Sequence, residues 1–289
     1  MEVASMRCHW RMLMVLMCCG FALAGWTRDK IETAQQAIAR AATFIKAVGW
    51  ITTATPTATF SDSASFTKMW DVQYRQPGKS DAVIELRVDR TTGQVHGAID
   101  MFPINDQPVE SSKTITPEQA KATAENVLHA AGISVRSFKL ETSLSDSIAS
   151  SPNAKQWGMF YRRIYAGYTF NNDTIQIILN PRNASLIRLL SFAQSPEPKS
   201  AKLVKTEADA RTIAQIFLPE HKWAIARIET AKLFIVQANN FFDRTTPTPT
   251  VPVSRLAWVV HCIRAGDGHY VEAWIDAENG EVIGGAACR

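Results

Sequence analysis

The 289-residue chain has no block of basic residues and no long hydrophobic run. Lys and Arg number 31 and Asp and Glu 27, a net excess of +4 that is spread along the sequence. A nucleic-acid-binding surface needs a concentrated basic patch, so nucleic acid is not an expected partner. The apolar run from Met12 to Gly25 is shorter than the roughly 20 residues that a membrane-spanning helix needs.

The chain also lacks common catalytic motifs: His-Glu-x-x-His and Gly-x-Ser-x-Gly are absent, and no Gly-Lys-Ser/Thr follows Gly266. The stretch Gly266-Asp267-Gly268 joins two predicted strands instead of opening a helix, which favours a hairpin turn over a phosphate loop. His261 and His269, with Cys262 and Asp267 nearby, are residue types that bind zinc, but only two of the four ligands of a structural site converge. We therefore predict no cofactor, no metal and no enzymatic activity. A hydrolase site assembled from distant segments stays open, with no nucleophile nominated.

The N-terminus predicts export. Arg7 and Arg11 precede the apolar run, and Ala22-Leu23-Ala24 has the small-x-small pattern that signal peptidase accepts. We interpret residues 1–24 as a signal peptide that directs the protein to a secreted or periplasmic location, with no transmembrane segment after cleavage. An uncleaved membrane anchor is the alternative.

Cysteine is scarce, and export would leave two residues of the five. Cys8, Cys18 and Cys19 depart with the signal, and Cys262 and Cys288 remain in an oxidising compartment. The predicted sheet separates these two by about two strand spacings, or ~9 to 10 Å, more than the roughly 7 Å Cα limit of a disulfide. They meet only if the tail after Gly284-Gly285 crosses the middle strand, so the disulfide is left open.

What the chain does contain is a repeated order of helix and strands. Apolar side chains recur at intervals of three and four residues, the spacing of an amphipathic helix, over residues 29–48, 116–132 and 206–219. The start Thr116-Pro117-Glu118-Gln119 is a capped helix N-terminus. Alternating strands are predicted at 69–76, 84–88 and 94–99, then at 135–141, 157–163, 174–179 and 186–190, and finally at 223–237 and across 256–285. The polar stretches Thr52 to Ser65, Thr142 to Asn153 and Asn239 to Pro252 are predicted to be loops and the places to look for a binding surface.

Each unit also has a turn signature near its end. The corners run from Asp89 to Gly93, from Asn180 to Ala184 and from Asp276 to Gly280, and an aromatic residue precedes each by 19, 19 and 18 residues. Asp or Asn at the start and Gly at the end suit a tight turn with side chain to backbone hydrogen bonds. Ala184 stands where the other copies have Gly, which predicts a different or strained turn.

These patterns predict an α+β protein of three tandem helix-on-antiparallel-sheet units after the signal peptide. The units span residues 26–104, 112–194 and 200–289, and each is expected to bury its own core. In the last unit, strand parity places Trp258 inward with Cys262. Trp274 has the opposite parity to Val271, Ala273 and Ile275, so it is predicted to be exposed and to be a candidate binding residue.

This arrangement resembles the PepSY family and the related segments in propeptides of thermolysin-type metallopeptidases. The residues that carry the resemblance are Thr116 to Gly132, Tyr165 to Tyr168 with Asn171 to Asp173, and Ala257-Trp258 through Asp276 to Val282. The resemblance implies a non-catalytic binding protein that inhibits or assists a secreted or periplasmic peptidase. Because no His-Glu-x-x-His occurs and no peptidase domain follows, such action is expected in trans. The alternative is a cell-envelope module that binds a small ligand or glycan through exposed aromatics.

Overall fold

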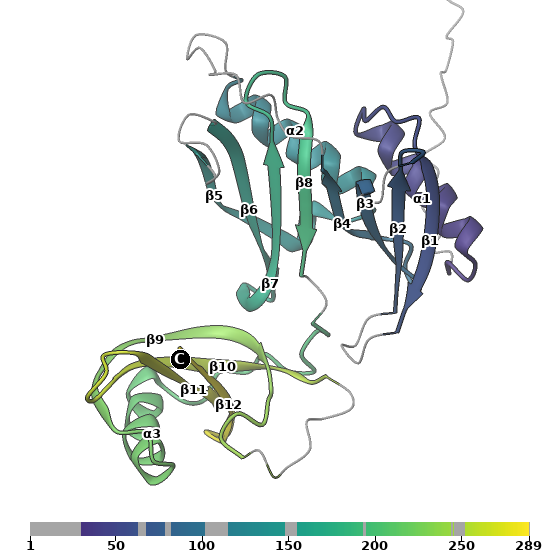
Figure 1. Ribbon diagram of the computed structural model, residues 1–289. Coiled ribbons are helices and arrows are strands. Elements are labelled where there is room, and N and C mark those ends of the chain that lie inside the picture. The colour runs from purple at the N-terminus through teal and green to yellow at the C-terminus, as the bar shows by residue number, and fades with distance from the viewer. Residues whose placement is uncertain are drawn as a thin grey trace, which may run out of the picture.

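The computed structural model describes residues 30–62, 68–78, 82–101, 115–147, 155–192, 195–243, 245 and 252–288 (Figure 1). The predicted signal peptide and the first linker, 105–113, lie outside these ranges, so both stay predictions. Among the described residues, no helix has the length and apolar character needed to cross a membrane.

The described chain is a mixed α+β structure in which one helix and four strands follow one another three times. The first set is α1 (Ala34–Ala47), β1 (Thr55–Ser61), β2 (Met69–Arg75), β3 (Ala82–Asp89) and β4 (Val95–Asp100). The second is α2 (Pro117–Ala130), β5 (Phe138–Ser147), β6 (Lys155–Tyr165), β7 (Tyr168–Leu179) and β8 (Leu186–Ser191), with a 3-10 turn, η2 (Val135–Ser137), before β5. The third is α3 (Glu207–Glu220), β9 (Ile225–Gln237), β10 (Ser254–Arg264), β11 (Tyr270–Asp276) and β12 (Val282–Ala287). We call these sets the first, second and third units.

All three helices begin with the same reciprocal cap. In each, a Thr side chain accepts a hydrogen bond from the backbone three residues on, and the side chain at that position bonds back to the Thr backbone. The pairs are Thr33 with Gln36, Thr116 with Gln119, and Thr206 with Asp209. The first helix therefore begins at Ala34, five residues later than the apolar spacing alone predicted.

The three corners share one geometry. The amide of the fifth residue donates to the carbonyl of the first, at 2.9 Å in the first and third units and 3.0 Å in the second. The side-chain oxygen of the first residue also accepts backbone N–H groups inside the turn, in each of Asp89, Asn180 and Asp276. The fifth residue has a positive φ in every copy: 66° at Gly93, 59° at Ala184 and 82° at Gly280. Ala184 thus adopts a left-handed conformation that costs a non-glycine residue roughly 1–2 kcal/mol.

The first two units join edge to edge into one sheet. Strand β4 pairs antiparallel with β8, with Gly97 opposite Leu190, which gives the order β1-β2-β3-β4-β8-β7-β6-β5. Helices α1 and α2 contribute to a single hydrophobic core on one face of that sheet. The Arg40 side chain on α1 links the two units, because its Nε donates to the Gly93 carbonyl at 2.7 Å and its Nη2 donates to the Ala130 carbonyl of α2 at 2.9 Å. The prediction of a separate core for each unit is therefore wrong for these two.

The third unit has its own core between α3 and the sheet β9-β10-β11-β12, and Figure 1 shows it set apart from the eight-stranded sheet. A single parallel bridge, Phe170 to Ile235, connects β7 to β9. Phe170 and Ile235 pack with Leu256 and Ala277 in a small cluster at this junction. The third unit is thus attached to the rest through a narrow apolar contact.

Two segments predicted to be loops are partly strand. Strand β1 lies inside the Thr52 to Ser65 stretch and pairs with β2, with Phe60 opposite Trp70. Strand β5 extends to Ser147, six residues into the second predicted loop. Both are edge strands of the eight-stranded sheet, where polar residues are tolerated because one side of the strand faces solvent.

Candidate functional site

Trp274 is buried, so the prediction that it is an exposed binding residue is wrong. Its side chain is 4% exposed and packs with Val236, Val259 and Ile283 on the face of the third sheet that points away from α3. Its indole N–H donates to Glu272 Oε2 at 3.2 Å. The parity was assigned correctly, but apolar side chains of the neighbouring strands on the same face bury the indole.

Cys262 and Cys288 do not form a disulfide. Cys262 pairs across the sheet with Val271, which pairs in turn with Ala287, so two strand spacings separate the two cysteines. Burial raises the pKa of the Cys262 thiol to about 11, with the positive charge of Arg211 acting in the opposite direction. The structure therefore contains two separate thiols.

Gly284 and Gly285 do not bring the two cysteines together. They make room for the loop that follows β9. The side-chain amide of Asn239 donates to the Gly285 carbonyl at 2.9 Å and accepts the Gly285 amide at 3.0 Å. A Cβ on Gly285 would overlap the carbonyl oxygen of Glu272 and lie 2.5 Å from Phe242 Cε2. The glycines therefore allow the loop after β9 to pack closely on β12.

The two histidines of the last hairpin have different surroundings. The His261 ring stacks on Tyr270, with 4.8 Å between ring centroids, and its Nδ1 lies 3.3 Å from Glu272 Oε1. His269 is exposed in the hairpin turn. Within the described ranges, no group of three or more His, Cys, Asp or Glu side chains is placed to hold a metal ion.

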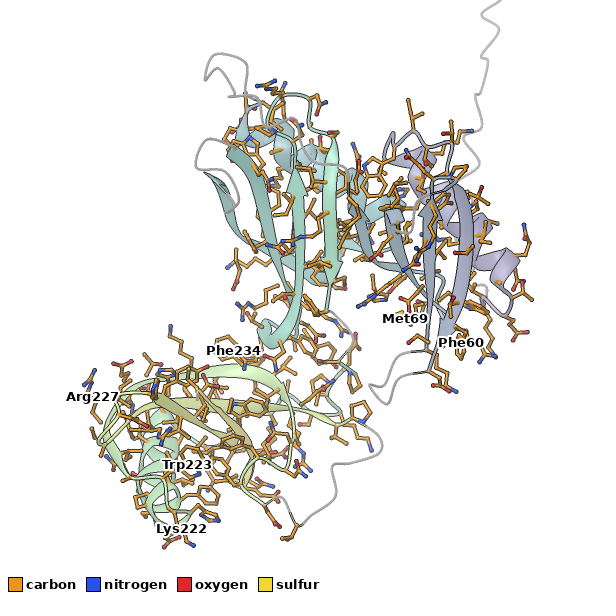
Figure 2. All side chains as sticks on the ribbon, viewed as in Figure 1. Phe60, Met69, Lys222, Trp223, Arg227 and Phe234 are labelled. Atoms are coloured by element: carbon orange, nitrogen blue, oxygen red, sulfur yellow. The ribbon has the colours of Figure 1, made fainter. Side chains whose placement is uncertain are left out.

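A pocket of about 740 Å³ opens on the face of the eight-stranded sheet opposite α1 and α2. We call it the open-face pocket. Strands β1 to β4 form most of it and the end of β8 completes it, and its volume lies within the range of about 300–1,000 Å³ typical of ligand sites. Met69, one of its lining residues, is labelled in Figure 2 at the end of the sheet nearer to the third unit.

The pocket floor carries two rows of cross-strand neighbours. In one row Asp71 lies opposite Arg87, and Arg87 lies opposite Gly97. Arg87 Nε is 3.3 Å from Asp71 Oδ1, an exposed ion pair that contributes little to stability. In the next row Gln73 Nε2 donates to Glu85 Oε1 at 3.2 Å. The alkyl stem of Arg87 lies over Gly97, where an added Cβ would make ordinary contacts of 3.5–3.6 Å with the stem carbons.

His96 lines the same pocket and has an unsatisfied ring nitrogen. A register shift between Arg87 and Val88 opposite β4 places His96 as the extra residue, and the side chain is 7% exposed. Its Nδ1 makes no hydrogen bond. Desolvation lowers the pKa of His96, while the nearby Asp89 carboxylate acts to raise it. The imidazole is therefore neutral at pH 7, and its Nδ1 is buried without a hydrogen-bond donor.

Sequence reasoning missed this pocket. The available signal was the alternation of Asp71 and Gln73 with the buried residues of β2, and of Glu85 and Arg87 with those of β3, which places all four on one polar face. What it could not supply was Leu190, which reaches the pocket only because β8 pairs with β4.

A family model matches part of the chain, and solved structures are similar to it at low sequence identity. No curated protein matches it. Among solved structures, the chain is similar to the Bacillus megaterium YpeB C-terminal domain, with 10% identity and a TM-score of 0.45 over 90% of this chain and 100% of that one. An uncharacterized protein from Eubacterium rectale has 10% identity and a TM-score of 0.46 over 89% of this chain and 82% of that one. Residues 205–285, which span most of the third unit, match the family model described as PepSY: Peptidase propeptide and YPEB domain.

Proposed function

We propose that the protein is an exported, non-catalytic binding protein of three PepSY-like units that inhibits or assists a secreted or periplasmic peptidase in trans. The match of residues 205–285 to a family described by peptidase propeptides is the observation that carries this proposal. A propeptide acts by binding its peptidase, and the same binding surface can act from a separate polypeptide.

Two hydrogen bonds support the extension of this unit type to the N-terminal part of the chain. The Trp258 indole donates to the Lys205 carbonyl at 2.8 Å, immediately before the capping Thr206 of α3. The Trp70 indole donates to the Ile31 carbonyl, also at 2.8 Å, two residues before the cap of α1. With the shared caps and corners, the same aromatic strand position fixes the same helix end in both units. Tyr161 occupies this position in the second unit.

Export is supported by the sequence of residues 1–24 and can be tested separately. Mass spectrometry of the protein recovered from the periplasmic or secreted fraction should find Gly25 as the first residue. A chain that retains residues 1–24 in a membrane fraction would instead favour the uncleaved anchor.

Capture from the same fraction tests the partner. The full-length protein, immobilised through a C-terminal tag, should enrich a peptidase relative to the same protein unfolded and blocked on the resin. The purified protein should then change the initial rate of that peptidase in a saturable way. The absence of any enriched peptidase, or a rate that stays constant at saturating concentrations, would refute the peptidase role.

A second candidate is a module that binds a small ligand. The open-face pocket favours it, since a buried imidazole nitrogen there lacks a partner, whereas the buried Trp274 cannot serve as an exposed aromatic platform. A glycan or metabolite that binds the wild type and not Gly97→Val, in which the pocket floor is filled, would support this function over the first.

A further inference from the structure

We infer that the open-face pocket binds an extended peptide segment of the partner protein, with a lysine or arginine side chain directed to Glu85 and a backbone N–H directed to His96. This inference rests on the proposed function, which makes the partner a polypeptide. It names the part of that partner which the pocket recognises.

The charge of the pocket favours a cation. Asp71 and Glu85 supply two carboxylates, and Arg87 supplies one guanidinium, which already lies 3.3 Å from Asp71. Glu85 accepts one bond from the Gln73 amide and has no ion-pair partner among the described residues. A bound anion would meet an excess of negative charge, while a Lys or Arg side chain would compensate Glu85.

His96, the second polar group of the pocket, requires a hydrogen-bond donor from the ligand. A neutral imidazole with its proton on Nε2 presents Nδ1 as an acceptor. In His96 this atom is buried in the pocket wall with no partner. An apolar ligand would leave His96 Nδ1 without a hydrogen-bond donor and would remove water from the Glu85 carboxylate, which is unfavourable.

The distance between these two groups favours a peptide over a small amine. Glu85 pairs with Ile99, and His96 lies three residues before Ile99 on β4. Because His96 is the extra residue of the bulge, it lies between two and three rungs from this row, a separation of about 7 to 10 Å along the strand. One ammonium group cannot bond to both ends, whereas about three residues of extended peptide cover the same distance. Ile99, which pairs with Glu85, and Leu190 provide apolar surface for the methylene stem of the bound side chain.

Binding of defined peptides to the full-length protein tests this inference. The probes are acetyl-Ala-Ala-Lys-Ala-Ala-amide, its Arg, Glu and norleucine analogues, and n-butylamine, measured by isothermal titration calorimetry at two salt concentrations. The Lys and Arg peptides should bind at least tenfold more tightly than the Glu and norleucine peptides, and more weakly at high salt. Equal affinity for the Lys and Glu peptides, or no binding of any peptide, would overturn the inference. Binding of n-butylamine as tight as that of the Lys peptide would assign the pocket to small amines.

Variants separate the two contacts. Glu85→Gln should weaken the Lys peptide at least tenfold and leave the norleucine peptide unchanged, while His96→Leu should weaken both by a similar factor. Gly97→Val should abolish binding by filling the floor, and its circular dichroism spectrum should match that of the wild type. Glu229→Gln, an exposed carboxylate on β9, is the matched control and should bind normally. An unchanged affinity in Glu85→Gln would refute the assigned contact.

The two proposals can fail independently. A peptidase captured equally well by the wild type and by Glu85→Gln would preserve the peptidase role and remove the pocket from it. Peptide binding with the expected variant pattern, in the absence of any captured peptidase, would preserve the pocket and remove the peptidase.

Discussion

Replacement of Gly285 by alanine should destabilise the third unit by about 2 kcal/mol. The new methyl group would overlap the Glu272 carbonyl oxygen and lie 2.5 Å from Phe242 Cε2. The Glu272 oxygen belongs to the neighbouring strand β11 and cannot move without disturbing the β11–β12 ladder. Insertion of a methyl group into a packed site that cannot relax costs about 1–3 kcal/mol, and we take the middle of that range because Phe242 is only half-buried and can shift.

Gly97→Ala is the matched control, since Gly97 occupies β4, the last strand of the first unit. There an added Cβ would lie 3.5 Å from Arg87 Cβ, an ordinary van der Waals contact. Alanine restricts the unfolded chain more than glycine does, so this variant should gain about 0.5–1 kcal/mol. The same substitution in the two strands should thus change stability in opposite directions.

Urea denaturation measures the free energies of unfolding, and hydrogen exchange assigns them to a unit. In Gly285→Ala the amides of α3 and β12 should lose protection, while those of α1 and α2, which belong to a separate core, should keep theirs. The double variant with Phe242→Ala should show a smaller added cost than the sum of the single variants, because one of the two clashes disappears. A Gly285→Ala variant as stable as the wild type would refute the assigned packing of the loop on β12.

Three further results are expected. Ala184→Gly should raise the free energy of unfolding by about 1 kcal/mol in urea titrations, since it relieves a left-handed alanine with φ of 59°; a loss of stability would contradict this. Iodoacetamide at pH 8 should modify Cys288 in the folded protein and Cys262 only after unfolding, as peptide mass spectrometry would show, because burial raises the Cys262 pKa to about 11; a cross-linked peptide under non-reducing conditions would contradict it. His96 has a folded pKa below its ordinary 6.5, so the stability it contributes is present above pH 6.5 and is lost as the pH falls below it. Urea titrations of His96→Gln between pH 7 and 5 should therefore show a smaller decrease in stability than the wild type.

The features that the sequence predicted well are local. A helix cap needs residues three apart, and a corner needs residues four apart, so Thr116 with Gln119 and Asp276 with Gly280 could be identified without knowledge of the rest of the chain. The corner geometry at Ala184 could be anticipated for the same reason, since only the residue type at one turn position was in question.

The errors concern which segments pair with a strand and which side chains pack against it. Thr57, Ala58 and Thr59 give no clear apolar alternation, so β1 was interpreted as a loop, although pairing with β2 holds it in place. Trp274 was placed on the correct face of its strand. The assumption that its side chain was open to solvent failed because Val236 and Val259, on strands β9 and β10 of the same sheet, pack beside it.

The largest difference is the joining of the first two units, and it depends on which sheet edges are left open. In the third unit, the loop after β9 returns to β12, where Asn239 N donates to the Ile283 carbonyl and the Asn239 side chain bonds to both backbone groups of Gly285. These bonds use the β12 groups that a neighbouring strand would need. In the first unit the corresponding strand β4 pairs instead with β8.

The same repeated order of helix and strands therefore has two outcomes, which differ in what bonds to the last strand of the unit. A covered last strand leaves the third unit with a separate core, and an uncovered one fuses the first two units into a continuous sheet. Fusion brings Leu190 beside Gly97 and completes the open-face pocket. The candidate site is thus a product of a pairing between strands about 90 residues apart, which no local pattern in either strand could have indicated.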